Sequence, residues 1–154
     1  MEPLVNACLP RSPQNLIAAI ASVNLTTAVD LQRDYGGNGW THCNLAVVRI
    51  LAALGITVPM KLANDLQLWF LGDGSRDGWR KVSLPEAMKA ADRGEPVVVS
   101  YFNDVGHGHI AVMRPSRGDG VPRIAQAGAR NFEDGTLAAG FGKLQNEVLF
   151  FTRG

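Results

Sequence analysis

The sequence has few of the residues that cross-link small proteins or bind metals. It contains two cysteines, Cys8 and Cys43, and three histidines, with no Cys-x-x-Cys or His-x-x-x-His pair. Two cysteines do not make a disulfide framework, and the missing ligand pairs argue against a structural zinc site. We therefore expect free thiols, synthesis in a reducing compartment and no bound metal.

Long apolar runs and an excess of one charge are also missing. No stretch of eighteen apolar residues occurs, so no membrane-spanning helix is predicted. The 15 basic and 14 acidic residues give a net charge of +1, which makes nucleic acid an unexpected partner. Glu2 stands where a signal peptide carries basic residues, and Pro10 and Pro13 interrupt the apolar stretch. These features predict no signal peptide, synthesis in the cytoplasm and no membrane partner.

The composition fits one folded domain. The chain is 154 residues long, with 46% hydrophobic and 19% charged residues, which suffices for one sizeable core. No linker, internal repeat or low-complexity tract divides it. We expect a single domain over residues 1–154, monomeric and without a cofactor.

Helix signals dominate the first half of the chain. Ser12 and Pro13 suit the cap and first position of a helix, and Ser83 and Glu86 form a capping-box pattern. Apolar residues at helical spacing follow both signals. We expect helices over about 13–21, 28–33, Thr41 or His42 to Gly55, 62–70 and 84–92, with a turn over 72–75.

Strand signals dominate the second half. Short apolar or β-branched runs, separated by Gly, Pro, Asn and Asp, lie at 97–101, 110–114, 123–127 and 147–152. We expect them to form an antiparallel sheet. Helices first and strands later predict an α+β domain, in which the helix that follows Cys43 packs on the sheet that carries His109.

Cys43 is the most informative residue. It follows the stretch Gly36-Gly37-Asn38-Gly39-Trp40-Thr41-His42 and precedes an apolar-periodic run, so we expect its thiol at a helix N-terminus. Unpaired amide N–H groups and the helix dipole stabilise a thiolate there, and the thiolate is the form that attacks a carbonyl carbon. The sequence therefore predicts a nucleophile, in a resting ion pair with an imidazolium.

His109 is the candidate general base, because it begins a predicted strand. His42 and His107 are rivals, but His42 is the sequence neighbour of Cys43 and His107 lies in a glycine-flanked turn. A zinc site of His42, Cys43, His107 and His109 is a further alternative, which the spacing disfavours. Cys8 has no histidine nearby in sequence and receives no role.

Three segments in this order resemble a family. Tyr35-Gly36-Gly37 ahead of Cys43, then Gly108-His109-Ile110-Ala111-Val112, then Ile124-Ala125-Gln126-Ala127-Gly128 are similar to the papain-like bacterial cell-wall hydrolases, with the NlpC and CHAP groups as the nearest match. The resemblance spans about 34–151. It implies a papain-like fold and cleavage of amide bonds in peptidoglycan. The NlpC group usually has Asp-Cys-Ser and a histidine at the third position, whereas this chain has His42-Cys43-Asn44 and Gln126.

The resemblance implies a role for each matched position. Cys43 corresponds to the nucleophile, His109 to the general base, and Gln126 to the polar residue that orients the imidazole. From the residues alone, Asn131 is an alternative to Gln126.

Four further residues are expected to bind substrate: Tyr35, Asn38, Trp40 and His107. Asn38 also lies in the 38–41 stretch expected to supply an oxyanion donor beside the Cys43 N–H. Trp40 is three residues from the thiol.

Two other functions stay open at this point. The same fold can serve as a non-catalytic module that binds wall peptides or a partner protein. The same thiol and imidazole can also transfer an acyl group to an amine or alcohol instead of water.

As a hydrolase, the protein is expected to act in the periplasm or cell wall after export by a dedicated route. A phage lysis enzyme and an interbacterial effector would both need such a route, and an effector would be paired with an immunity protein.

Overall fold

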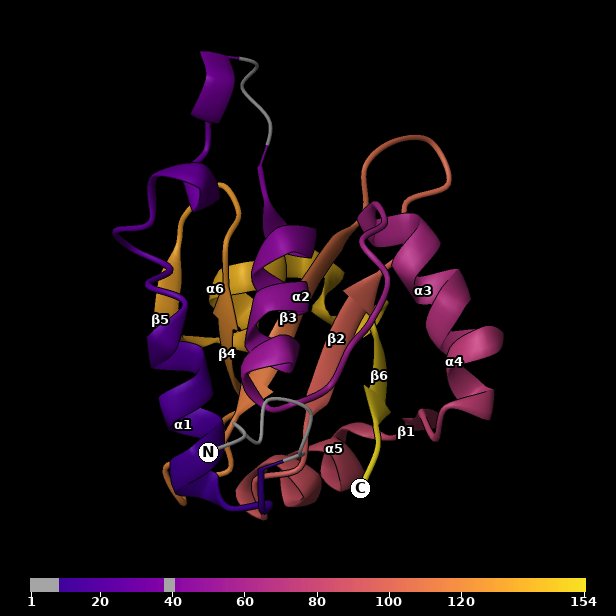
Figure 1. Cartoon of the computed structure of the whole chain (residues 1–154). Helices are drawn as coiled ribbons and strands as arrows, with labels where there is room; N and C mark the ends of the chain where they lie inside the picture. Colours follow the sequence, from indigo (N-terminus) through magenta and orange to yellow (C-terminus); the bar gives the residue numbers. More distant parts are fainter. Residues whose placement is uncertain (1–8, 38–40) are drawn as a thin grey trace, which may run out of the picture.

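The computed structural model describes residues 9–37 and 41–154. Within these residues, helices precede and flank one antiparallel sheet (Figure 1). The helices are α1 (Pro13–Ser22), α2 (Cys43–Ala53), α3 (Ala63–Leu71), α4 (Asp73–Arg76), α5 (Leu84–Asp92) and α6 (Leu137–Phe141), with 3-10 turns η1 (Val29–Leu31), η2 (Tyr35–Gly37) and η3 (Gly142–Asn146). The α+β prediction is confirmed.

The sheet has six strands in the described part of the chain. They are β1 (Arg80–Val82), β2 (Val97–Tyr101), β3 (His109–Arg114), β4 (Arg123–Gln126), β5 (Phe132–Thr136) and β6 (Leu149–Thr152). Their order is β1-β6-β2-β3-β4-β5, and every neighbouring pair is antiparallel. β3 is therefore an inner strand, paired with β2 on one side and β4 on the other.

Local capping explains two of the predicted helix starts. The Ser12 side chain accepts a hydrogen bond from the Asn15 N–H at 3.0 Å, with Pro13 in the first turn of α1. Ser83 and Glu86 form the expected capping box of α5. These side chains satisfy N–H groups that have no partner inside a helix, so the sequence alone fixes where both helices begin.

Some elements differ from the predictions. The expected turn over 72–75 lies largely in the short helix α4, and strands β1 and β5 were not expected. β1 is three residues long and β5 contains Glu133, Asp134 and Gly135, so neither carries a run of apolar residues. Pairing with β6 and β4 supplies the backbone hydrogen bonds that their own sequences do not favour.

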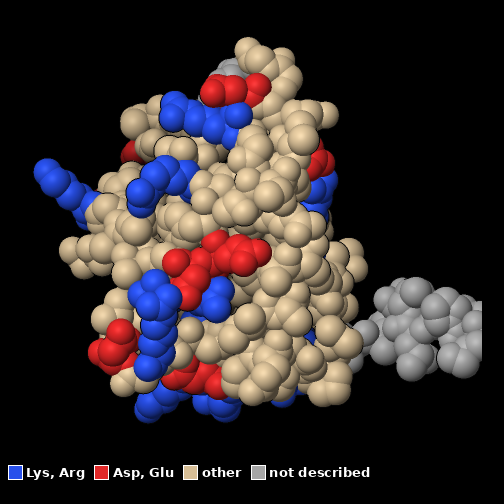
Figure 2. All heavy atoms as spheres, turned by 90° about the vertical axis from the view of Figure 1, so that its left-hand side faces the viewer, with Lys and Arg blue, Asp and Glu red and all other residues tan. Residues whose placement is uncertain are grey.

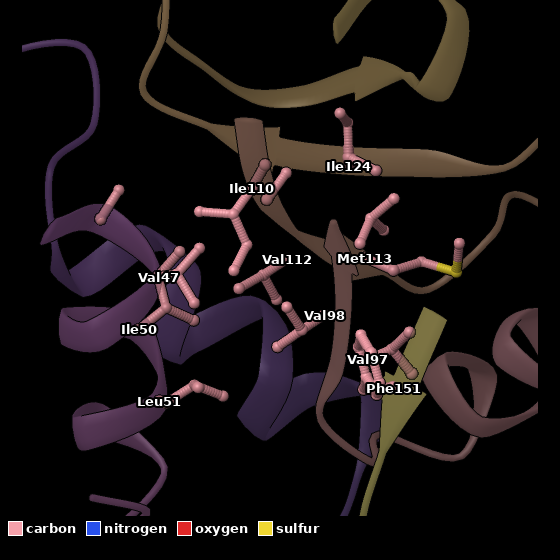
Figure 3. Packing of buried hydrophobic residues seen from close by; sticks show 14 of the residues in the cluster. Val47, Ile50, Leu51, Val97, Val98, Ile110, Val112, Met113, Ile124 and Phe151 are labelled. Atoms are coloured by element: carbon pink, nitrogen blue, oxygen red, sulfur yellow. The ribbon is translucent and has the colours of Figure 1, made fainter. Parts of the chain in front are cut away.

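The core is centred between α2 and the middle of the sheet. In Figure 3, Val47 and Ile50 of α2 point toward Ile110 and Val112 of β3. All four side chains are almost completely buried. This packing places the first turn of α2 beside the beginning of β3, as the sequence predicts.

None of the helices in residues 9–37 and 41–154 is long and apolar enough to span a membrane.

On the face in Figure 2, acidic and basic side chains lie close to one another. One carboxylate, Asp134 on β5, binds three guanidinium groups. Arg117 donates to it at 2.8 Å, Arg123 also donates to it, and the Arg114 Nε lies 3.6 Å away.

Asp134 offsets the repulsion between two arginines on neighbouring strands. Arg114 and Arg123 lie directly opposite each other on β3 and β4, and like charges in that position destabilise a sheet. Burial raises the pKa of Asp134, but the hydrogen bonds from Arg123 and Arg117 outweigh it and hold this pKa below its usual range. The carboxylate therefore stays charged to unusually low pH.

We predict that Asp134→Asn lowers the free energy of unfolding by about 1–3 kcal/mol, between the values typical of exposed and of buried ion pairs. Urea denaturation at neutral pH measures it, with the exposed Asp119→Asn as control. Because the folded pKa of Asp134 is lowered, its stabilisation is present above an unfolded pKa of about 3.9 and is lost as pH falls through the folded pKa. Equal stability of both variants would contradict the role of Asp134.

Candidate active site

Cys43 is the first residue of α2. The apolar residues that follow it pack α2 on β3, so the chain brings the thiol to the sheet whenever the core forms. His42 occupies the cap position but makes no side-chain cap hydrogen bond. The Cys43 side chain is 6% exposed, and it is a free thiol.

The Cys43 sulfur lies against the beginning of β3. Burial raises the pKa of the thiol, and the backbone N–H groups of Ile110, Asn44 and Cys43 itself lower it in part. The β3–β4 register runs from Arg114–Arg123 to Val112–Ala125 and stops before Ile110. The sulfur therefore contacts β3 where this pairing has ended, one residue after His109.

His109 is oriented by Gln126 on the neighbouring strand. The His109 Nε2 and Gln126 Oε1 are 2.7 Å apart. The Gln126 Nε2 donates to the Arg130 carbonyl oxygen at 2.9 Å, which fixes the amide with its oxygen toward the ring. An amide oxygen only accepts, so this network assigns the proton of neutral His109 to Nε2 and leaves Nδ1 as the basic nitrogen.

Small residues and one aromatic ring enclose this pair. The Phe141 ring of α6 lies 4.7 Å from the His109 ring, centroid to centroid. A Cβ at Gly140 would lie 2.6 Å from Gln126 Oε1, and one at Gly128 would lie 3.1 Å from His109 Cε1. Glycine at both positions lets the backbone pack closely against the His109–Gln126 hydrogen bond.

The predicted resting ion pair is not favoured. Burial lowers the pKa of His109, and the hydrogen bond that the ring donates to Gln126 raises it only in part. Burial also raises the pKa of the Cys43 thiol. Both shifts favour the neutral form of each group, and neither side chain is among the causes of the other's shift. The sequence argument considered the helix terminus but not the burial that the core imposes on the thiol.

A cleft of about 450 Å³ opens beside Cys43. The N-termini of α2 and α3 form one side, and the loop between β2 and β3 forms the other. The lining residues are Thr41, Cys43, Asn44, Leu62, Ala63, Asn64, Asp65, Gly106, His107 and Gly108. Asp65 is the one Asp, Glu, Lys or Arg among them, so the described walls carry little charge.

Asn131 has a different position from Gln126. Its Nδ2 donates to the carbonyl oxygens of Leu25 and Leu31, at 2.9 and 2.7 Å, and its Oδ1 accepts from the Gly128 N–H at 2.9 Å. All of these contacts join the N-terminal segment to the loop after β4. Between the two candidates for the third position, Gln126 is therefore the one bonded to the His109 ring.

Of the four predicted substrate-binding residues, two lie in the described part of the chain, and only one of these lines the cleft. His107 lines the cleft with Cys43. Tyr35 packs against His42, with ring centroids 6.0 Å apart, and is not among the residues that line the cleft. Asn38 and Trp40 lie outside the described residues. Within residues 9–37 and 41–154, no group of three or more His, Cys, Asp or Glu side chains is placed to hold a metal ion.

Sequence reasoning missed several parts of this site. Phe141, Gly140 and Asn64 belong to segments that were not expected to approach His109, and the Ile110 N–H is a backbone group with no sequence signal. Only the glycine-rich run around Gly140 hinted at close packing. No protein-family model matches the chain, and no curated protein matches it in sequence.

We predict that the alkylation rate of Cys43 by iodoacetamide keeps rising above about pH 8.5, the ordinary pKa of a cysteine thiol. The physical reason is that burial raises the pKa of this thiol. Mass spectrometry of the Cys43 peptide across a pH series measures the rate. A plateau already reached below pH 7 would instead indicate the thiolate–imidazolium pair.

Proposed function

We propose that the protein is a papain-like cysteine hydrolase that cleaves amide bonds in peptidoglycan stem peptides or cross-links. The observation that carries this proposal is the placement of Cys43 and His109. The Cys43 sulfur faces the N–H of Ile110, and the preceding residue, His109, keeps Nδ1 free while Nε2 is held by Gln126. Cys43 lines the cleft, the candidate base His109 follows the cleft-lining residue Gly108, and its orienting group Gln126 lies on the neighbouring strand β4.

In the proposed reaction the neutral thiol attacks the carbonyl carbon as its proton passes to His109 Nδ1. Backbone N–H groups in the first turn of α2 stabilise the oxyanion that forms. The imidazolium then protonates the leaving amine, and a thioester remains on Cys43. His109 next removes a proton from water, the hydroxide attacks the thioester, and a carboxylic acid and the free thiol are released.

The choice of peptidoglycan rests on the resemblance of residues 34–151 to cell-wall hydrolases, and the cleft is compatible with it. About 450 Å³ suits a few residues of a peptide, not a folded protein. Its walls carry small side chains at Ala63, Gly106 and Gly108, which leave room for branched or D-configured residues. A phage lysis enzyme and an interbacterial effector fit this proposal equally.

A second function, binding without catalysis, is favoured by one observation. Cys43 is 6% exposed, and its pKa is raised, which are properties of a buried structural cysteine. In that case the cleft would hold a wall peptide and release it unchanged. The two functions differ in whether new termini are formed.

We predict that the wild-type protein releases peptides with new amino termini from purified peptidoglycan, and that Cys43→Ala lowers this rate by about four orders of magnitude or more. Mass spectrometry of the released fragments identifies the bond. Cys8→Ala is the matched control and is expected to keep full activity. If walls of several chemotypes bind the folded protein but yield no new termini, the binding module replaces the hydrolase.

We also predict that Gln126→Ala lowers kcat by about a hundredfold with little change in KM. The substitution leaves His109 in place but frees its ring, and misplacement of a reacting group by about 1 Å costs a factor of this size. Steady-state kinetics on a purified wall fragment separate the two constants. An Asn131→Ala variant is the comparison: a larger kcat effect there, in a protein of wild-type stability, would identify Asn131 as the orienting residue.

A further inference from the structure

The loop over residues 102–108 joins β2 to β3 and ends at His109. Its central residues are exposed, with Val105 at 91%, so hydrophobic burial does not hold it in place. The loop is also longer than a tight hairpin turn, which would fix its own geometry. Gly106, His107 and Gly108 nevertheless form one wall of the cleft. Contacts other than core packing must therefore determine the position of these three residues.

Asn64, in the first turn of α3, supplies that anchor. Its Oδ1 accepts from the Asn103 N–H at 2.9 Å, and its Nδ2 donates to the carbonyl oxygens of Asn103 at 2.7 Å and Gly106 at 3.0 Å. The Asn64 side-chain amide thus binds the loop backbone at both Asn103 and Gly106, about forty residues away in sequence. No side chain caps α3, so the Asn64 amide is committed to the loop and not to its own helix.

Contacts within the loop transmit this anchor toward His109. The Asn103 Nδ2 donates to the His107 carbonyl oxygen at 3.1 Å, and the Asn103 Oδ1 accepts from the Val105 N–H at 3.2 Å. Gly108, the residue before His109, packs so closely on Asn64 that an added Cβ would lie 2.4 Å from its Oδ1. Asn64 therefore touches the backbone immediately before the candidate base.

We propose that Asn64 is a positioning residue of this site: its side-chain amide fixes the 102–108 loop that leads into His109, and so sets the width of the cleft and the access of water to the His109 ring. This inference rests on the proposed function for its catalytic consequence. The consequence for the loop and for the His109 ring is independent of any reaction.

The test compares Asn64→Ala with Gln67→Ala. Gln67 lies one turn further along α3 and donates to the Ser100 carbonyl oxygen and hydroxyl, so it ties the same helix to β2 without touching the loop. Hydrogen exchange of the Asn103 N–H reports the anchor, and ¹⁵N NMR of the His109 ring reports the Nε2–H form and its titration. Neither readout needs a substrate.

We expect Asn64→Ala to accelerate exchange of the Asn103 N–H by about tenfold or more and to move the His109 titration toward that of a free histidine, because the freed loop admits water. On a wall substrate, kcat is expected to fall by about 10–100-fold. Gln67→Ala is expected to change thermal stability but to leave both the Asn103 N–H exchange and the His109 NMR signals unchanged. Unchanged Asn103 exchange and His109 titration in Asn64→Ala would overturn the proposal, as would equal changes in both variants.

Asn64→Asp is the second variant, should the alanine variant fail to fold. The carboxylate still accepts from the Asn103 N–H but faces the carbonyl oxygens of Asn103 and Gly106 with no proton to donate. Protection is expected to persist at Asn103 and to fall at Gly106, whose N–H donates to the Asn103 carbonyl oxygen at 3.4 Å, with the His109 titration altered. Wild-type protection throughout would contradict the anchor. If the wild-type protein cleaves no wall substrate, the proposed function fails, while the exchange and NMR results still decide the role of Asn64.

Discussion

The packing of α2 on β3 determines where every part of the candidate site lies. Val47 and Ile50 meet Ile110 and Val112 in the core, and this contact brings the first turn of α2 to the place where β3 and β4 stop pairing. The Cys43 sulfur is set there by a helix whose position is fixed by hydrophobic burial, and it faces the backbone N–H of Ile110 on β3. The same burial that positions the thiol also keeps it neutral.

Neutrality gives His109 a particular task. In an ion pair the histidine would have taken the proton in advance, whereas in the proposed hydrolysis a neutral His109 accepts it during attack, which requires Nδ1 to be unprotonated and aimed. The Gln126 amide meets the first need by holding the proton on Nε2, and it adds no charge that would raise the pKa of the ring strongly. Phe141 and two glycines pack closely around that bond. The site thus relies on orientation more than on charge.

Much of the fold could be predicted because its signals are local. The caps at Ser12 and Ser83, the periodicity after Cys43 and the apolar runs of β2, β3 and β4 act within a few residues of one another. β1 and β5 were not predicted because they carry no run of apolar residues, and backbone hydrogen bonds to β6 and β4 hold them in the sheet. For the site, the sequence context indicated Cys43 and His109, and the family resemblance added Gln126. Burial of the thiol and the reach of Asn64 across to the 102–108 loop are tertiary effects with no signature in sequence.

In the proposed function the Cys43 thiol performs the hydrolysis of wall peptides. The most direct measurement is graded alkylation with iodoacetamide, in which peptide mapping counts modified Cys43 and Cys8 separately and each sample is assayed for wall-peptide release. We expect activity to fall in proportion to the modified fraction of Cys43 alone, and added wall peptides to slow the modification and the loss of activity together. Activity that survives complete modification of Cys43 would contradict this role of the thiol.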